Sequence, residues 1–212
     1  MTYLADVGAL ARKDLILELR ARDTLPAMLL FVLSTLVVFH FVLPSDSSQL
    51  AAKGLLWVAI LFTALLGLAR AFAAEREQGV IDGLVLATRD RSAIWLGKAL
   101  AIFAFLGLAE IVALPAFGLF FTHVGGGTIA GVVLADVGIC AVGTLLAAMA
   151  TASRARELLL PLIFLPLTIP IVVGGVGASV TGHPGKYLAF LALYDAIFGL
   201  VAWGSFEYVV TE

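Results

Sequence analysis

Three acidic residues stand inside long apolar runs of this sequence: Glu110, Asp136 and Asp195. No Lys or Arg lies at a similar depth in these runs. An ionised carboxylate at the centre of a bilayer costs about 2.5–3.5 kcal/mol on insertion scales, so each group is expected to face other helices or to stay protonated. Such carboxyls line a substrate path, contact a partner subunit, carry ions or protons, or hydrogen-bond between helices. The sequence leaves these roles open.

The three histidines, His40, His123 and His183, lie at or near the ends of apolar runs. Three imidazoles are a ligand set for haem or a metal ion, but nothing in the sequence brings these three together. Histidine is also a residue that a membrane interface tolerates. No haem or metal ligand is therefore assigned.

Motifs of soluble-enzyme chemistry are absent from the sequence. It has no GxxxxGKS/T loop for a nucleotide, no HExxH for zinc, and no Ser or Cys nucleophile beside a plausible base. The single cysteine, Cys140, sits in an apolar run and is expected to be a small buried hydrophobe. We expect a non-catalytic chain without a directly bound cofactor or metal. If it runs on ATP, the nucleotide site lies on another polypeptide.

The composition places these residues in lipid. The chain has 212 residues, of which 62% are hydrophobic and 13% charged, and its mean hydropathy is +1.09. Polar side chains are too few to cover a water-soluble globule of this size. The net charge of -2, with cations spread along apolar boundaries, gives no case for nucleic acid as a partner.

Six apolar runs are long enough to cross a hydrocarbon core as helices. They lie at about 25–43, 54–74, 94–121, 128–150, 158–180 and 187–209. Eleven of the 13 Lys and Arg residues fall in three clusters that alternate with nearly cation-free connections, and only Lys53 and Lys186 lie elsewhere. Cations at helix ends stay in the cytoplasm, so both termini are expected there. Residues 25–212 are thus expected to form a six-helix transmembrane domain.

Residues 3–23 have a helical apolar pattern that Glu18 interrupts. We expect residues 1–24 to form an amphipathic helix in the cytoplasmic interface, where its cations meet anionic headgroups. An ordinary solvated helix is the alternative.

The inner connection at 75–91 is too charged to cross a membrane. Val80, Ile81, Leu84 and Val85 nevertheless recur at helical spacing on one side, which predicts a short amphipathic helix parallel to the membrane. Its apolar edge needs a partner. Lipid headgroups and a docked cytoplasmic protein are equally good partners on physical grounds.

The fifth run contains Pro161, Pro166 and Pro170. Each proline removes a backbone donor and clashes with the carbonyl four residues back, so a kinked or broken helix is expected in the cytoplasmic half. Irregular backbone at membrane depth must be covered by protein or line a wet cavity, so this span is expected to face other helices. Small residues of the fourth run predict close packing, within the chain or across a dimer: Gly131, Ala135, Gly138 and Gly143.

Several blocks of the chain resemble one family. They are Leu55-Leu56-Trp57-Val58-Ala59, Leu65-Leu66-Gly67-Leu68-Ala69-Arg70-Ala71-Phe72, the segment Glu75 to Leu86, Leu160-Pro161, and Leu165-Pro166-Leu167-Thr168-Ile169-Pro170. In their order they resemble the CcmB or haem-exporter family, the membrane subunit of the cytochrome c maturation ABC transporter. The resemblance covers nearly the whole chain.

The resemblance implies an all-α permease of the ABC-2 exporter type in the bacterial inner membrane. It implies a separate cytoplasmic ATPase that holds the ATP, haem-handling membrane subunits, a periplasmic haem chaperone whose haem-loaded form is released, and a second copy of the chain. Haem would be cargo, and the family suggests no haem-ligand motif on the three histidines. Residues 3–23 would be the interfacial connecting helix. The ATPase-docking coupling helix would comprise Arg76, Glu77, Gln78, Gly79, Val80, Ile81, Asp82 and Leu84.

Two other functions stay open at this point. One is an ABC-2 permease for a different amphipathic cargo, such as a lipid or a drug. The other is an ion-coupled carrier that uses Glu110, Asp136 and Asp195.

Overall fold

The computed structural model describes residues 3–44, 49–79, 81–88, 90–152 and 156–211. These residues are almost entirely helical. The elements are α1 (Tyr3–Ala21), α2 (Thr24–Val42), α3 (Gln49–Arg70), α4 (Ala73–Glu77), α5 (Ile81–Ala87), α6 (Ser92–Phe120), α7 (Gly126–Ala152), α8 (Arg156–Val180) and α9 (Gly185–Thr211).

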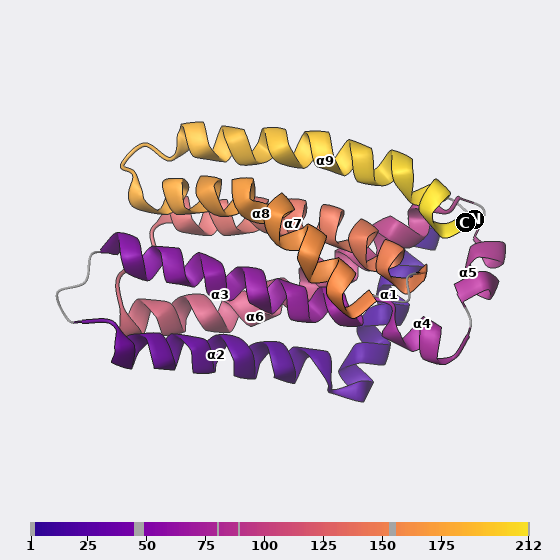
Figure 1. Ribbon diagram of the computed structural model, residues 1–212, viewed down its shortest axis with the longest axis horizontal. Coiled ribbons are helices and arrows are strands. Elements are labelled where there is room, and N and C mark those ends of the chain that lie inside the picture. Colours follow the sequence, from indigo (N-terminus) through magenta and orange to yellow (C-terminus); the bar gives the residue numbers. More distant parts are fainter. Residues whose placement is uncertain (1–2, 45–48, 80, 89, 153–155, 212) are drawn as a thin grey trace.

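Six of these helices, α2, α3, α6, α7, α8 and α9, are long and apolar enough to cross a membrane. The expected all-α integral membrane fold with six spans is therefore confirmed. Five of the spans agree with the expected boundaries to within two residues. Together the six helices form one bundle whose axes run along its longest dimension (Figure 1).

The second span differs from its expected range. The sequence predicts 54–74, whereas α3 begins at Gln49 and ends at Arg70, so Lys53 lies inside the helix. The Lys53 ammonium donates a hydrogen bond to the Ser179 carbonyl oxygen of α8, at 2.5 Å. This contact gives the Lys53 ammonium a hydrogen-bond acceptor at the start of the span. Local hydropathy does not reveal such a contact between helices.

The short helices α4 and α5 lie at one end of the bundle. Figure 1 shows α1 lying across this end, with α4, α5 and both chain ends beside it. At the opposite end lie the last turn of α2, the first turn of α3, and the connections α6–α7 and α8–α9 (Figure 1).

Helix α7 lies at the centre of the packing because its small residues admit close neighbours. An added Cβ at Gly143 would overlap Leu68 of α3, and one at Gly138 would overlap Asp195 of α9. The Trp57 ring occupies the space that a side chain at Gly175 of α8 would need. The close packing expected of the fourth span is thus used within this chain.

Helix α8 runs without a break through Pro161, Pro166 and Pro170. It slants across the bundle over its N-terminal half (Figure 1). The expectation that this span faces only other helices is wrong for the single chain. Leu162, Pro166, Ile169 and Val173 form an exposed apolar stripe, with Leu162 73% exposed. Pro166 is itself part of this apolar surface.

Candidate functional site

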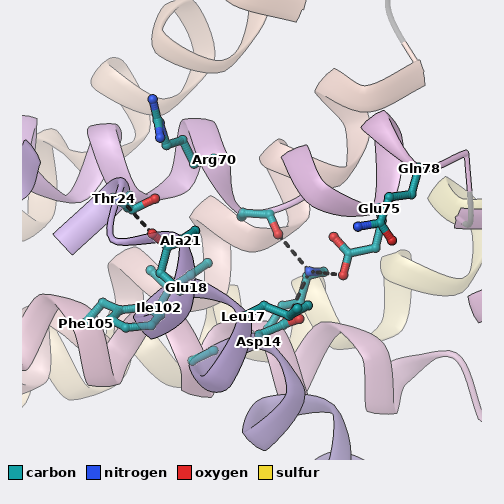
Figure 2. Close-up of a pocket in the computed structure, with 14 residues that line it drawn as sticks. Asp14, Leu17, Glu18, Ala21, Thr24, Arg70, Glu75, Gln78, Ile102 and Phe105 are labelled. Carbon is teal, nitrogen blue, oxygen red and sulfur yellow. Dashed lines mark hydrogen bonds and ion pairs between the residues drawn. The ribbon is translucent and has the colours of Figure 1, made fainter.

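Four charged side chains from three elements meet where α1 crosses the bundle: Lys13 and Asp14 of α1, Glu75 of α4 and Lys98 of α6. Lys98 Nζ lies 2.9 Å from Glu75 Oε1 and 3.1 Å from Asp14 Oδ2. Lys13 Nζ lies 2.5 Å from the same Glu75 oxygen and 3.1 Å from Asp14 Oδ1. Figure 2 shows Asp14 and Glu75 converging from different helices. These four residues are called the ion network below.

The backbone around the ion network explains how it forms. Gly97 of α6 lets α1 approach closely, because a Cβ there would lie 2.8 Å from Leu10 Cβ. Helix α3 ends at Arg70, and the following turn offers the Ala71 carbonyl oxygen to Lys98 Nζ at 2.7 Å. Phe72, buried in the same turn, places its ring 4.6 Å from that ammonium. This connection therefore places Glu75, in the first turn of α4, next to Lys98.

All hydrogen-bond donors of the Lys98 ammonium have acceptors in this arrangement. Its ammonium has three N–H donors, and three acceptors surround it: Asp14, Glu75 and the Ala71 carbonyl. The side chains of Lys98 and Glu75 are each only 4% exposed. A buried ion pair is costly unless its hydrogen bonds are made, and here every donor of Lys98 is used.

The electrostatics keep the ion network charged. Burial alone would raise the pKa of Glu75, but the attraction of Lys98 and the hydrogen bonds from Lys13 and Lys98 hold that pKa below its ordinary value. Burial alone would lower the pKa of Lys13, but the hydrogen bond to Glu75 and the attraction of Asp14 raise it. Glu75 and Lys13 thus remain ionised around neutral pH.

A cavity of about 230 Å³ opens beside the ion network. Figure 2 shows its lining, in which Glu18 and Arg70 join Asp14 and Glu75. The Glu18 carboxylate accepts the backbone N–H of Thr24 at 2.7 Å, so it caps the first turn of α2. This explains why Glu18 interrupts the apolar pattern of residues 3–23.

The expected coupling helix is two short helices. Helix α4 ends at Glu77, Gly79 has a φ of 64°, and α5 begins at Ile81. This left-handed conformation suits glycine and breaks the helix. Val80 lies outside the described residues, and only the backbone of Glu77, Ile81 and Asp82 is described.

The other docking candidates differ in exposure. Gln78 and Gly79 are exposed, and Arg76 is half-buried. Leu84, expected on an open apolar edge, packs half-buried against the bundle. Leu86 is 87% exposed instead. Arg76 also lines a cavity of about 350 Å³ together with Pro161, so two of the sequence-derived sites lie close to each other.

The intramembrane carboxyls separate into a pair and a single group. Glu110 of α6 and Asp136 of α7 are buried and close enough to interact, and Glu110 Oε1 and Asp136 Oδ1 have no hydrogen-bond partner among the described residues. Asp195 of α9 lies against Gly138 of α7. Among the residues that the structure describes, no three His, Cys, Asp or Glu side chains gather as a metal site, and the histidine trio does not converge.

The ion network serves to join helices, because its charges neutralise one another and are hydrogen-bonded. It fixes α4 to both α1 and α6. Sequence reasoning missed this network, since Lys13 and Lys98 are there treated as cations that orient the chain. The available signal was the position of Lys98 inside an apolar run.

Comparison with known proteins gives a consistent result. The model of the CcmB protein family matches residues 6–204. A relative called Heme exporter protein B, from Bradyrhizobium diazoefficiens, is 31% identical over 206 residues, covering 91% of this chain and 93% of the relative. Proteins of the same name from Paracoccus denitrificans and Pseudomonas aeruginosa are 32% and 29% identical, covering 87% and 89% of this chain and 88% of each relative.

Proposed function

The chain belongs to the CcmB family, and on this premise we propose that it is the permease subunit of an ABC transporter in cytochrome c maturation. It couples ATP hydrolysis on a separate cytoplasmic subunit to haem delivery or to release of a haem-loaded periplasmic chaperone. Its partners are the ATPase, the haem-handling membrane subunits, the chaperone and a second copy of the chain. ATP stays on the ATPase, and haem is cargo.

The ion network is the observation that carries the coupling step. An ATPase docked on α4 and α5 displaces α4, and Glu75 passes that displacement to α6 through Lys98 and to α1 through Lys13. Because the ammonium of Lys98 has no spare donor, the three elements move together. Fully satisfied buried polar networks make the elements that they join rigid, which supports this coupling.

The location follows from the cation pattern and from the end at which the termini lie. Arg12, Lys13, Arg20 and Arg22 precede the first span, on the side of the bundle that also carries α4 and α5 (Figure 1). The positive-inside rule supports a cytoplasmic location for this side, and membership of the CcmB family supports the bacterial inner membrane as the location of the protein. Residues 1–24, with α1 across the bundle end, form the interfacial helix.

Recruitment of the ATPase tests this function. The tagged chain, solubilised from its native membrane, is expected to retain an ATPase subunit with a nucleotide-binding loop. Leu86→Asp removes the exposed apolar side chain of α5 and should reduce that retention while membrane insertion stays normal.

Leu4→Asp is the matched control, because Leu4 is 75% exposed on α1 and lies at the same end of the bundle. Equal retention by wild type and Leu86→Asp would refute docking through α5. A wild-type chain that recruits no ATPase would refute both ABC-transporter functions and favour the ion-coupled carrier.

A further inference from the structure

His40 stands apart from the other two histidines. It lies in the last turn of α2, at the end of the bundle opposite the termini, next to the end of α6 (Figure 1). His40 Nδ1 lies 3.0 Å from the Phe120 carbonyl oxygen. That carbonyl belongs to the last turn of α6, where helical carbonyls lack an intrahelical partner.

This contact determines which ring nitrogen carries the proton. A carbonyl oxygen only accepts hydrogen bonds, so Nδ1 must be the N–H donor. In the neutral imidazole, Nε2 then bears the lone pair. His40 is exposed, and no described residue is a hydrogen-bond partner of its Nε2. Histidines that bind metals in proteins use this arrangement, because a hydrogen bond from one nitrogen to a carbonyl orients the ring and raises the basicity of the other.

Three phenyl rings surround the imidazole. Ring centroids of Phe120, Phe41 and Phe121 lie 5.2, 5.5 and 5.9 Å from that of His40. Phe121 is held in turn by stacking on Phe117, which is fully buried. Phe41 is 81% exposed, so an open aromatic ring lies next to the exposed imidazole. A flat apolar ligand with a metal centre suits a surface that combines one imidazole with several phenyl rings.

We propose that His40 Nε2 is an axial ligand to the iron of haem at this end of the bundle, with the porphyrin resting against Phe41 and its neighbours. The proposal rests on the function proposed above, which supplies haem as cargo and puts this end on the periplasmic side. Binding is a coordination step: the Nε2 lone pair enters an open iron position, and no electron or proton is transferred. The competing account is that His40 only satisfies the Phe120 carbonyl.

Titration of ferric haem into the full-length chain in lipid nanodiscs tests the site, followed by the Soret band and by electron paramagnetic resonance. Wild type is expected to give the spectrum of a histidine-ligated iron. His40→Ala should weaken binding by at least about tenfold, the lower end of what even an outer-shell partner contributes at a metal site. His123→Ala and His183→Ala are matched controls, because both residues are also exposed at this end of the bundle, and they should bind as wild type.

His40→Gln separates the two accounts, since an amide N–H still donates to a carbonyl but does not ligate iron in this way. A His40→Gln protein that is as stable as wild type and has lost the spectrum supports ligation. Identical spectra for wild type and all His variants would overturn it, as would absence of a histidine-ligated spectrum in wild type. ATPase retention in the same preparation reports on the proposed function independently, so the two failures are distinguishable.

Discussion

Among single residues, Lys98 determines how firmly α4 is held to the bundle. Lys98→Met keeps the apolar stem and removes the charge, which leaves Glu75 and Asp14 with Lys13 alone. Removing one partner of a buried pair costs about 3–5 kcal/mol, so a clear loss of stability is expected. Thermal unfolding of the purified protein in detergent measures it.

The Glu75→Gln variant completes a double-mutant cycle with Lys98→Met. Because the amide needs no cation, the double variant should be more stable than the sum of the two single effects. Strictly additive losses would show that the two side chains do not act as a pair. The same variants report on coupling: ATPase retention should persist, while nucleotide-driven transport falls.

The ion network also predicts how stability depends on pH. The folded-state pKa of Glu75 is below the ordinary value of 4.5, so its contribution is fully present above that value and is lost as pH falls through the folded-state pKa. The pKa of Lys13 is raised above 10.5, so its contribution is fully present below that value and is lost as pH rises through the raised pKa. Melting temperatures should therefore form a plateau with an acidic and an alkaline limb. Glu75→Gln should flatten the acidic limb, and an unchanged acidic limb would contradict the assignment.

The carboxyl pair between α6 and α7 allows a separate test. Two carboxyls buried near each other in an apolar setting repel when both are charged, so we expect them to share a proton. Glu110→Gln still donates to Asp136 and should support normal cytochrome c assembly, whereas Glu110→Leu leaves Asp136 unpaired and should cost about 1–3 kcal/mol of stability. Loss of assembly in Glu110→Gln at normal expression would instead indicate a charged role, as in an ion-coupled carrier.

The sequence predicts how deep in the membrane these residues lie. It does not predict which neighbouring helix each side chain faces. The hydropathy pattern identifies Glu110, Asp136 and Asp195 as intramembrane groups, because apolar runs of helical length reveal how far along a helix each one lies. It does not reveal which face each helix presents to which neighbour. The pairing of Glu110 with Asp136 and the ion network around Lys98 both depend on helix rotation, so only the structure reveals them.

Helix placement gives a prediction at Gly97. A Cβ at this position would press on Leu10 of α1, whereas one at Gly107 of the same helix would meet nothing within 4 Å. Gly97→Val should therefore push α1 off α6 and weaken the Lys98–Asp14 contact, with a loss of about 1–3 kcal/mol from overpacking. Gly107→Val is the control and should be close to neutral. Melting temperatures and limited proteolysis of α1 measure both, and equal behaviour would refute close packing of α1 at Gly97.

Long helices were predictable because six apolar runs have no other stable form in lipid. The short elements were less so. Helical periodicity over 75–86 indicates one helix, but Gly79 adopts a positive φ and divides it. The prolines of α8 predict a kinked or broken helix. The helix is not broken at any of them, and it exposes Pro166 with its apolar neighbours. Local patterns therefore identified the segments, whereas backbone geometry and tertiary contacts decided their final form.

The final prediction concerns the orientation of the whole molecule in the membrane. Gln78 and Gly182 are both exposed, and they lie in turns at opposite ends of the bundle. The only native cysteine, Cys140, is buried, so introduced cysteines can be labelled selectively. In intact spheroplasts a membrane-impermeant maleimide should label Gly182→Cys, and it should label Gln78→Cys only after the membrane is opened. Labelling of Gln78→Cys from outside would reverse the orientation and remove α4 and α5 from the compartment that holds ATP. The coupling route through Glu75 and Lys98 would then have no source of force.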